Sequence, residues 1–374
     1  MTVLAAARVV TNDAVLEPGW VAIEGSTILA VGSGNPPTEY GAVHDLGTVA
    51  LVPGFVDMHC HGGGGHWMIG TDPVEIAAAG QFHLRHGTTT MLAGAITVGA
   101  ERLPSVVKAI GEVASDESNP IIGSHLEGPW ISISRCGAHD TAYIREPDPQ
   151  EWAGLDHRWI RMVTYAPELA GADRLAASIL DIGAVAAVGH SDATYAIGAA
   201  ALSSGSSVGT HLFNAMSPLG HREPGLVGAC LEGAICELIL DLHHVSAPVA
   251  RIAFAAAAGR VALVTDAVAP AGLPDGTHEI LGGTLRVVGG AAWLGQTLAG
   301  STLTMSSALS NAVSIGVPLI EACRAASSVP AGALGLNARG VIAAGLRADL
   351  VALSRSGTVE AVWRAGVPVS LRQE

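Results

Sequence analysis

Several short aliphatic runs in this chain end on side chains that bind metals or move protons. The runs are Val-Asp-Met-His59-Cys-His61, Ile-Ile-Gly-Ser-His-Leu-Glu127, Val-Ala-Ala-Val-Gly-His190, Val-Gly-Thr-His211 and Val-Ala-Leu-Val-Thr-Asp266. Imidazoles combined with a carboxylate form a donor set that zinc and similar divalent metals accept. Because such residues recur at the same point of each run, we predict a single metal-dependent hydrolytic site.

His59 and His61 lie two positions apart, so in a strand both side chains project from the same face and could bind one metal. An isolated pair with this spacing is more often a solvated strand end. The interpretation as a metal site gains weight from the glycine turn at residues 62–65, directly after the pair. Metal binding therefore depends on where the fold places this strand end.

Glu127, His190 and His211 form a second set, with two imidazoles and one carboxylate. A buried Glu127 needs a cation or a shifted pKa, and a salt bridge with an arginine is the alternative. Asp266 is not required as a ligand of this set, so we expect it to act as the general base and acid.

Other polar residues near these runs have less certain roles. His125 shares a face with Glu127, and we expect it to be packed in the interior or to support a ligand. Asp192 could orient a ligand or cap a helix. Lys108 is the only lysine and falls in a predicted helix, so neither a Schiff base nor a carbamylated lysine between two metals is expected. If two metals bind, Glu127 must bridge them.

Continuous aliphatic runs are typical of parallel strands that are buried on both faces. The predicted barrel strands are 50–60, 88–95, 121–127, 160–166, 184–190, 207–211, 235–242 and 261–266. The helices predicted between them include 73–86, 101–115, 172–181, 195–203 and 248–258. This alternation favours an α/β fold, a (β/α)8 TIM barrel with its chemistry at the carboxyl ends of the strands. Neither a dinucleotide-binding glycine motif after a first strand nor a Walker motif occurs.

Both ends of the chain differ from this pattern. Residues 1–50 and 337–374 contain short, partly alternating strands and no helix signals, so we expect one small flanking β-sandwich built from both termini. The barrel would then span residues 51–336. Residues 276–298 are rich in glycine, and we predict a hairpin that could cover the mouth of the site.

Composition restricts the class of protein. The chain has 374 residues, 49 % of them hydrophobic, which indicates a globular protein. A formal charge of −14 argues against partners such as nucleic acid or anionic membrane, so an anionic ligand would need a local positive cluster. Arg8 and Asp13 interrupt any signal-peptide core, and no apolar run reaches the roughly 18 residues of a membrane span. Five cysteines without a CxxC pair indicate a reducing compartment, so we expect a cytoplasmic protein.

A resemblance to a known family rests on eight motifs. They are Pro-Gly-Phe-Val-Asp-Met-His59-Cys-His61-Gly, His-Leu-Glu127-Gly-Pro, Gly-Ala-His139, Gly-His190-Ser-Asp-Ala-Thr, Thr-His211-Leu-Phe-Asn214-Ala-Met, Arg222-Glu-Pro-Gly, Leu-Val-Thr-Asp266-Ala and Leu-Ala-Gly-Ser301. The first resembles the entry motif of the amidohydrolase superfamily. Together, from about residue 50 to the end, they resemble its N-acetylglucosamine-6-phosphate deacetylase family. The resemblance implies a barrel with a flanking β-domain, a homodimer, and a sugar phosphate as the small-molecule substrate.

The resemblance also implies roles for individual residues. Glu127, His190 and His211 would hold the principal metal, and His59 and His61 a second one. Asp266 would activate water and later protonate the departing amine, while His139 would polarise the acetamide carbonyl. The residues expected to contact the sugar phosphate are Asn214, the backbone of Ala215, Arg222, His244, Leu298 and Ser301. Arg222 and His244 could come from the neighbouring subunit.

Some points stay open at this stage. Some members of the family lack the first histidine of the pair, so one or two metals are expected; zinc is the first candidate, and iron, manganese or cobalt fit the same donors. His244 is assigned by spacing, with His243 as the alternative. Cys136, near His139, is expected to be an incidental thiol rather than a ligand or redox sensor. Cys60 should point away from the site, because alternate residues of a strand face opposite sides.

The expected reaction is hydrolysis of the N-acetyl group of N-acetyl-D-glucosamine 6-phosphate, which gives D-glucosamine 6-phosphate and acetate. A different amidohydrolase, such as a cyclic-imide hydrolase or a purine aminohydrolase, is the first alternative. Such an enzyme should not depend on a sugar phosphate. A barrel without metal that serves as a scaffold is the second alternative, and metal analysis would distinguish it.

Overall fold

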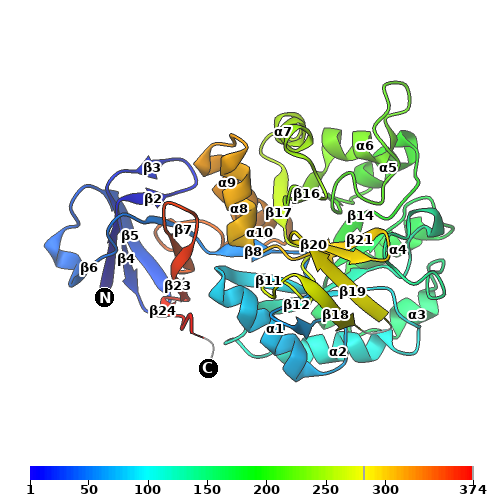
Figure 1. Ribbon diagram of the computed structural model, residues 1–374, viewed down its shortest axis with the longest axis horizontal. Coiled ribbons are helices and arrows are strands. Elements are labelled where there is room, and N and C mark those ends of the chain that lie inside the picture. The colour runs from blue at the N-terminus through cyan, green and yellow to red at the C-terminus, as the bar shows by residue number, and fades with distance from the viewer. Residues whose placement is uncertain (281–282, 373–374) are drawn as a thin grey trace.

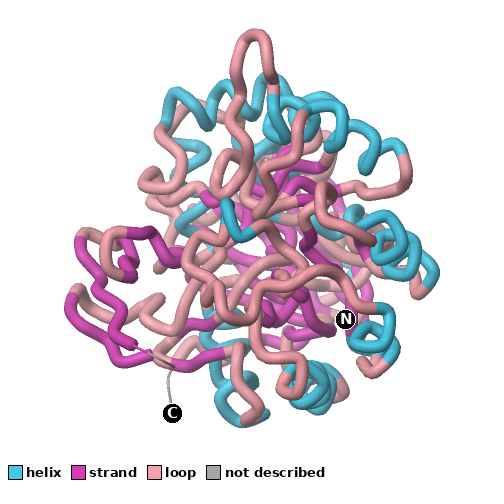
Figure 2. Tube along the Cα trace, turned by 90° about the vertical axis from the view of Figure 1, so that its right-hand side faces the viewer, coloured by secondary structure: helices cyan, strands magenta, loops and turns pink. Residues whose placement is uncertain are grey.

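The computed structural model describes residues 1–280 and 283–372 of the chain. Strands from the two ends of the chain lie side by side at one end of the molecule, and an α/β barrel forms the rest (Figure 1). Figure 2 shows the barrel strands near the centre, with helices around the outside. Among the described residues, no helix is long and apolar enough to cross a membrane.

The barrel is an eight-stranded parallel sheet among the described residues. In spatial order its strands are β8 (Phe55–Asp57), β11 (Thr88–Ala95), β12 (Ile121–Glu127), β13 (Ile160–Tyr165), β14 (Val185–Val188), β15 (Val208–Gly209), β16 (Ile235–Ile239) and β17 (Val261–Val264). Most of their side chains are buried, because helices cover the outer face and side chains fill the interior. The predicted fold class is confirmed.

Hydrogen bonds between the ends of β8 and β17 join the first and last strands of this sheet. The backbone N–H of Asp266 donates to His59 O at 2.8 Å, and His61 N–H donates to Ala267 O at 2.8 Å. Slightly earlier along the same two segments, the Thr265 hydroxyl donates to Asp57 Oδ2 at 2.6 Å. The first and last of the polar strand ends are therefore held directly against each other.

Helices follow most barrel strands, and their starts match simple capping rules. They are α1 (Pro73–Arg85), α2 (Leu103–Ala114), α3 (Pro149–Ala153), α4 (Ala172–Asp181), α5 (Tyr195–Ser203), α6 (Gly225–Gly233), α7 (Ala247–Ala256), α8 (Met305–Ser314), α9 (Leu319–Ala326) and α10 (Ser328–Ala333), with single 3₁₀ turns at Thr38–Tyr40, Ile133–Arg135 and His157–Trp159. In α1, for example, the Asp72 side chain accepts a hydrogen bond from Val74 N–H, and Pro73 occupies the first turn.

The flanking β-structure consists of two sheets. One has the order β5 (Thr27–Ser33), β4 (Gly19–Glu24), β1 (Thr2–Ala6), β6 (Val43–Asp45); the other has the order β24 (Val367–Pro368), β23 (Val359–Arg364), β22 (Leu350–Leu353), β7 (Ala50–Pro53), β2 (Arg8–Val10), β3 (Val15–Leu16). Strand β22 pairs antiparallel with β7, so the two ends of the chain share a sheet. We propose from this pairing that residues 1–50 and 337–374 form one domain and residues 51–336 the other. The rest of β7, residues 51–53, nevertheless pairs within the flanking sheet.

A four-stranded antiparallel sheet follows the last barrel strand, at the place of the predicted hairpin 276–298. Its strands are β18 (Gly276–Ile280), β19 (Gly283–Val288), β20 (Ala291–Leu294) and β21 (Thr297–Ser301). Leu285 and Val287 of this sheet pack on Val268, just after β17. A short hairpin of β9 (Gly62–Gly63) and β10 (His66–Trp67) lies next to it, and Trp67 packs on the same cluster.

Most predicted elements are confirmed, with some differences in their bounds. Strands 88–95 and 121–127 have the predicted limits. The predicted strand 50–60 is two strands, β7 in the flanking sheet and β8 in the barrel, because Gly54 separates them. Several barrel strands are shorter than predicted because their last residues leave the ladder and enter the site. Helices α3, α6, α8, α9 and α10 were not predicted individually.

Candidate metal centre and active site

The barrel brings the polar residues of the five aliphatic runs to one place. Their exposed fractions are 0 % for His59, 4 % for His61, 3 % for Glu127, 4 % for His190, 4 % for His211 and 8 % for Asp266. His190, His211 and Asp266 have positive φ angles of 46°, 30° and 46°. A non-glycine residue whose backbone is held in this region reduces the stability of the fold by about 1–3 kcal/mol. The conformation persists only where the surrounding structure fixes it. Such strain is common at functional sites.

One group of donors consists of Glu127, His190 and His211. Glu127 Oε1 lies 3.0 Å from His190 Nε2 and 3.0 Å from His211 Nε2. The two Nε2 atoms are 3.0 Å apart. These residues come from the ends of three barrel strands, β12, β14 and β15.

A second group consists of His59, His61 and Asp266. His59 Nε2 lies 3.1 Å from His61 Nε2, and Asp266 Oδ1 lies 3.5 Å and 3.2 Å from these two nitrogens. The second oxygen of Glu127, Oε2, is 3.0 Å from His61 Nε2. Oε1 is also 3.4 Å from His59 Nε2, so Glu127 faces both groups. Its ion partners among the described residues are histidines rather than an arginine.

The proton positions on these rings favour a positive charge between the ring nitrogens and Glu127. His61 Nδ1 must donate to Gly94 O at 3.2 Å, and His190 Nδ1 must donate to Arg135 O at 2.7 Å, because a carbonyl oxygen only accepts. In the neutral rings, Nε2 would then carry a lone pair that faces the Glu127 carboxylate. Two acceptors at 3.0 Å repel each other unless a cation or an added proton lies between them.

The distances suit a metal ion. Four donors that bind one zinc ion at about 2.0–2.1 Å in tetrahedral directions lie about 3.3–3.4 Å apart. The donor separations in the two groups are 3.0–3.5 Å. The residues present therefore fit one divalent metal in each group.

The pKa shifts reflect the same concentration of charge. Burial lowers the pKa of His61, but Asp266 and Glu127 outweigh burial and raise it to about 9. Burial raises the pKa of Asp266, but His59 and His61 outweigh burial and lower it to about 2. In these buried groups the ionised carboxylates favour a positive charge on the ring nitrogens, where a metal would supply it.

His139 completes the inner wall of the site. Its side chain is 6 % exposed, and its Nδ1 accepts a hydrogen bond from Thr97 N–H at 3.3 Å and lies 2.9 Å from the Thr97 hydroxyl. Nε2 then carries the ring proton and points at Glu127 Oε2, 3.3 Å away. Burial lowers the pKa of His139 despite the attraction of Glu127. A neutral imidazole thus presents an N–H donor to the site.

Among the residues predicted to bind phosphate, His244 is the most tightly held. Its Nδ1 lies 2.7 Å from Asp241 Oδ2, and both side chains are 5 % exposed. Burial lowers the pKa of His244, but Asp241 and then Asp266 outweigh it, so the pKa is raised. His243 is exposed and its Nε2 donates to Gly289 O at 3.0 Å, in the β19–β20 turn. Of the two histidines, His244 is the one buried in the barrel mouth.

The other predicted substrate residues differ in exposure. Arg222 lies on an exposed loop before α6, while Asn214 is partly buried and donates to the His211 and Leu212 carbonyls at 3.3 Å. Ala215 has a φ of 49°, and its carbonyl accepts a hydrogen bond from Ser191 N–H.

Leu298 and Ser301 belong to β21. Leu298 is partly buried, whereas the Ser301 hydroxyl is buried and donates to Thr265 O at 2.6 Å. The structure therefore gives Ser301 a role in holding the end of β17. Substrate contacts of these residues stay predictions.

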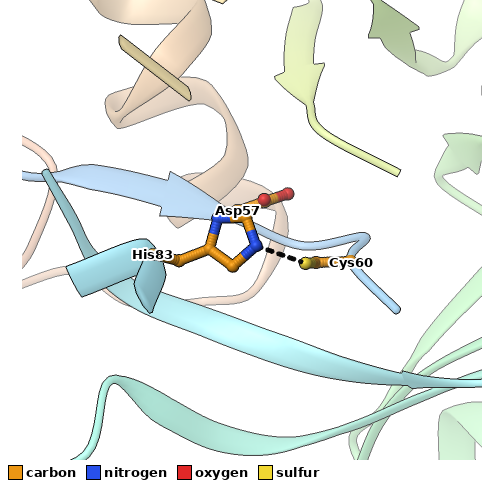
Figure 3. Close-up of side chains that lie close together, drawn as sticks. All are labelled: Asp57, Cys60 and His83. Atoms are coloured by element: carbon orange, nitrogen blue, oxygen red, sulfur yellow. Dashed lines mark hydrogen bonds between the residues drawn. The ribbon is translucent and has the colours of Figure 1, made fainter. Parts of the chain in front are cut away.

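The side chains of Asp57, Cys60 and His83 lie close together and form a third group of potential ligands (Figure 3). His83 Nε2 must donate to Gly62 O at 2.9 Å, because a carbonyl cannot donate, and it lies 3.2 Å from Cys60 Sγ. Both Asp57 oxygens accept hydrogen bonds, from Thr265 and from His59 N–H. All three side chains are fully buried. This group supports the turn after His61, and Cys60 points away from the centre as predicted.

Two supporting residues were not predicted from the sequence. Thr97 fixes the tautomer of His139, and Glu237 is fully buried and contacts His59. The sequence did contain a signal for Glu237, which is a charged residue inside the apolar run Ile-Cys-Glu-Leu-Ile of β16. Thr97 carried no comparable signal.

Three residues with open roles are also placed. His125 packs its ring against His59, with centroids 4.4 Å apart, and bonds Thr164 Oγ1 at 2.8 Å. Asp192 pairs with Arg135, whose carbonyl orients His190, and Thr194 rather than Asp192 caps α5. Cys136 is not in any of the three groups of potential metal ligands among the described residues.

A parallel barrel whose strand ends carry two adjoining groups of imidazoles and carboxylates defines a class of metal-dependent hydrolase. Comparison with known families agrees. The model of the amidohydrolase family matches residues 50–369, and this chain belongs to that family.

Relatives within the family are named as deacetylases of an N-acetylated amino-sugar 6-phosphate. N-acetylglucosamine-6-phosphate deacetylase of Bacillus subtilis is 34 % identical over 80 % of this chain and 78 % of its own length. N-acetylgalactosamine-6-phosphate deacetylase of Escherichia coli O157:H7 is 32 % identical over 97 % of this chain and 98 % of its own. A structure of the N-acetyl-D-glucosamine-6-phosphate deacetylase of Mycobacterium smegmatis in complex with N-acetyl-D-glucosamine-6-phosphate is 41 % identical, with a TM-score of 0.92, covering 98 % of each chain.

Proposed function

We propose that this chain is a metal-dependent deacetylase that hydrolyses the acetamide of N-acetyl-D-glucosamine 6-phosphate to D-glucosamine 6-phosphate and acetate. The observation that carries the proposal is the convergence of Glu127, His190 and His211 at 3.0 Å, next to the group His59, His61 and Asp266. The names of the relatives support the substrate. A role in the catabolism and recycling of amino sugars follows from the same reaction.

Glu127, His190 and His211 would hold the first metal, and His59, His61 and Asp266 the second, with Glu127 between them. A divalent metal bound here would supply a hydroxide at neutral pH, because it lowers the pKa of bound water to about 7. Zinc is the first candidate, and iron, manganese or cobalt suit the same donors. The fixed Nδ1 bonds of His61 and His190 support this assignment, since they leave both Nε2 atoms as ligands.

The residues around the metals would divide the proton chemistry. Asp266 lies at the barrel mouth with one oxygen 3.2 Å from His61 Nε2, so its carboxylate can take a proton from water and return it to the departing amine. His139 Nε2–H would donate to the acetamide oxygen. Thr97 keeps that proton on Nε2, because its backbone N–H occupies Nδ1.

The phosphate would bind where the chain offers positive charge near the mouth. His244 is supported by its raised pKa beside Asp241, and Arg222 by its exposed position on the loop before α6. Asn214 and the Ala215 backbone would contact the sugar, and Leu298 and Ser301 would complete its surroundings. We also propose a homodimer in which Arg222 reaches the site of the neighbouring subunit, and a cytoplasmic location, for which the five free cysteines are consistent support.

Acetate release from a panel of sugars tests the proposal. The metal-loaded protein should deacetylate N-acetyl-D-glucosamine 6-phosphate and lose most activity on the unphosphorylated sugar, because the phosphate contacts are lost. The 4-epimer, N-acetyl-D-galactosamine 6-phosphate, belongs in the panel because a relative carries that name. If the protein prefers the epimer, its substrate is the galactosamine derivative, and the proposed deacetylation reaction still holds. No acetate from either phosphate, or activity on imides or purines instead, would refute the deacetylase proposal.

A further inference from the structure

Glu237 is a carboxylate in the interior of the barrel, on β16, and none of its surface is exposed. Its neighbours along the strand are apolar, so it is the one charged residue of β16. A buried carboxylate costs stability unless its partners compensate for the lost hydration. The contacts of Glu237 therefore indicate why the residue is there.

One oxygen of Glu237 contacts both proposed metal sites. Oε2 accepts a hydrogen bond from His59 Nδ1 at 3.0 Å and another from the backbone N–H of His211 at 3.1 Å. His59 belongs to the site with His61 and Asp266, whereas His211 belongs to the site with Glu127. Glu237 thus contacts one residue of each site from the interior of the barrel. Glu127, by contrast, lies between the two sites.

The bond to His59 decides which ring nitrogen can bind a metal. Since a carboxylate only accepts, Nδ1 of His59 carries a proton, and in the neutral ring the lone pair is on Nε2. Nε2 points at the other members of the site, 3.1 Å from His61 Nε2 and 3.5 Å from Asp266 Oδ1. Glu237 therefore sets both the tautomer and the direction of the imidazole.

The other ligand histidines have weaker partners. His61 and His190 donate from Nδ1 to backbone carbonyls, those of Gly94 and Arg135. Nδ1 of His211 has no partner among the described residues. Among these four rings, His59 is the one whose Nδ1 is bonded to a carboxylate within the described residues. A charged acceptor at Nδ1 makes a stronger bond and a more basic ligand than a neutral one.

A purely structural role accounts less well for Glu237. Its second oxygen, Oε1, is buried and has no hydrogen-bond partner among the described residues, an arrangement that costs free energy. An apolar side chain of similar size would avoid that cost. A second divalent cation would instead offset the negative charge through the His59 ring.

We propose that Glu237 is a positioning residue that gives the His59–His61–Asp266 site its affinity for the second metal. This inference rests on the metal centre of the proposed function and adds a residue that does not itself touch the metal. Loss of such a carboxylate partner typically weakens metal binding about 10–100-fold. The first metal, held by Glu127, His190 and His211, should be affected much less.

The test is E237Q, which keeps the shape and the acceptor oxygen but removes the charge. Metal-free wild-type and variant proteins are titrated with Co²⁺, and the two binding steps are followed by the cobalt absorption spectrum and by elemental analysis. The matched control is E168Q. Glu168 is a carboxylate that follows β13, and it accepts hydrogen bonds from Ser191 Oγ and Asp192 N–H rather than from a ligand imidazole. Melting temperatures of all proteins show whether each variant is folded.

We expect E237Q to bind the first Co²⁺ like the wild type and the second about 10–100-fold more weakly, while E168Q binds both normally. In an H59A background, E237Q should leave Co²⁺ binding as it is in H59A alone, because Glu237 acts through that ring. A second step in E237Q within about threefold of wild type, or equal weakening of both steps, would overturn the inference. Fewer than two ions on the wild type would instead refute the two-metal centre itself.

Discussion

Replacement of Asp266 by asparagine tests the proposed proton transfer most directly. The exchange keeps the shape of the side chain, and the backbone around it is held independently. Asp266 N–H donates to His59 O at 2.8 Å, and Asp266 O accepts from Ser301 N–H at 2.8 Å. The strand end should therefore stay in place while the side chain loses its ability to accept a proton.

The expected magnitude follows from the role of the residue. A positioned general acid or base contributes about 10²–10⁴-fold to the rate, which corresponds to about 2.7–5.4 kcal/mol of barrier. Because Asp266 also faces His59 and His61, its loss should weaken the second metal as well, and metal content has to be measured in parallel. Substrate binding should change little, since the proposed phosphate contacts lie elsewhere.

The assay measures kcat and KM from acetate release, together with metal content and the equilibrium binding of substrate. The matched control is D241N, the same exchange in a carboxylate that contacts His244 rather than the metal-binding histidines. We expect D266N to lower kcat by at least about 100-fold and D241N to raise KM instead. A D266N enzyme that keeps kcat within about tenfold of wild type, at normal metal content, would refute the assignment of Asp266.

Three further variants and conditions test the rest of the site. R222A should raise KM for the phosphorylated sugar with little change in kcat, and an unchanged KM would place the phosphate elsewhere. H59A and H61A should each retain about one metal per chain by elemental analysis, whereas loss of both metals would contradict two separate groups. Because the pKa of His244 is raised, mainly by Asp241, its positive charge persists to a higher pH than on an ordinary histidine and is lost as the pH rises through that pKa. KM should therefore increase as the pH is raised beyond the usual titration range of histidine, and in D241N this increase should begin at lower pH. A flat KM profile would exclude His244 as a phosphate contact.

The sequence was sufficient for the architecture of the barrel. Aliphatic runs buried on both faces, separated by helices, predicted the strands and the end of each strand at which polar residues gather. Strands 88–95 and 121–127 were placed at the observed bounds. The division at residues 50–60 was missed, because both strands are equally apolar and only pairing distinguishes them; β7 joins β22 near the other end of the chain.

The sequence also determined the chemical identity of the site, because residue type and position at strand ends are local properties. Which residues come together as candidate ligands of one metal was decided by the tertiary structure. Asp266 lies with His59 and His61 since hydrogen bonds between β8 and β17 join the first and last strands of the barrel. The partners of each ring, such as Glu237 behind His59, come from other strands, and the sequence could not pair them because closure brings together residues 178 positions apart.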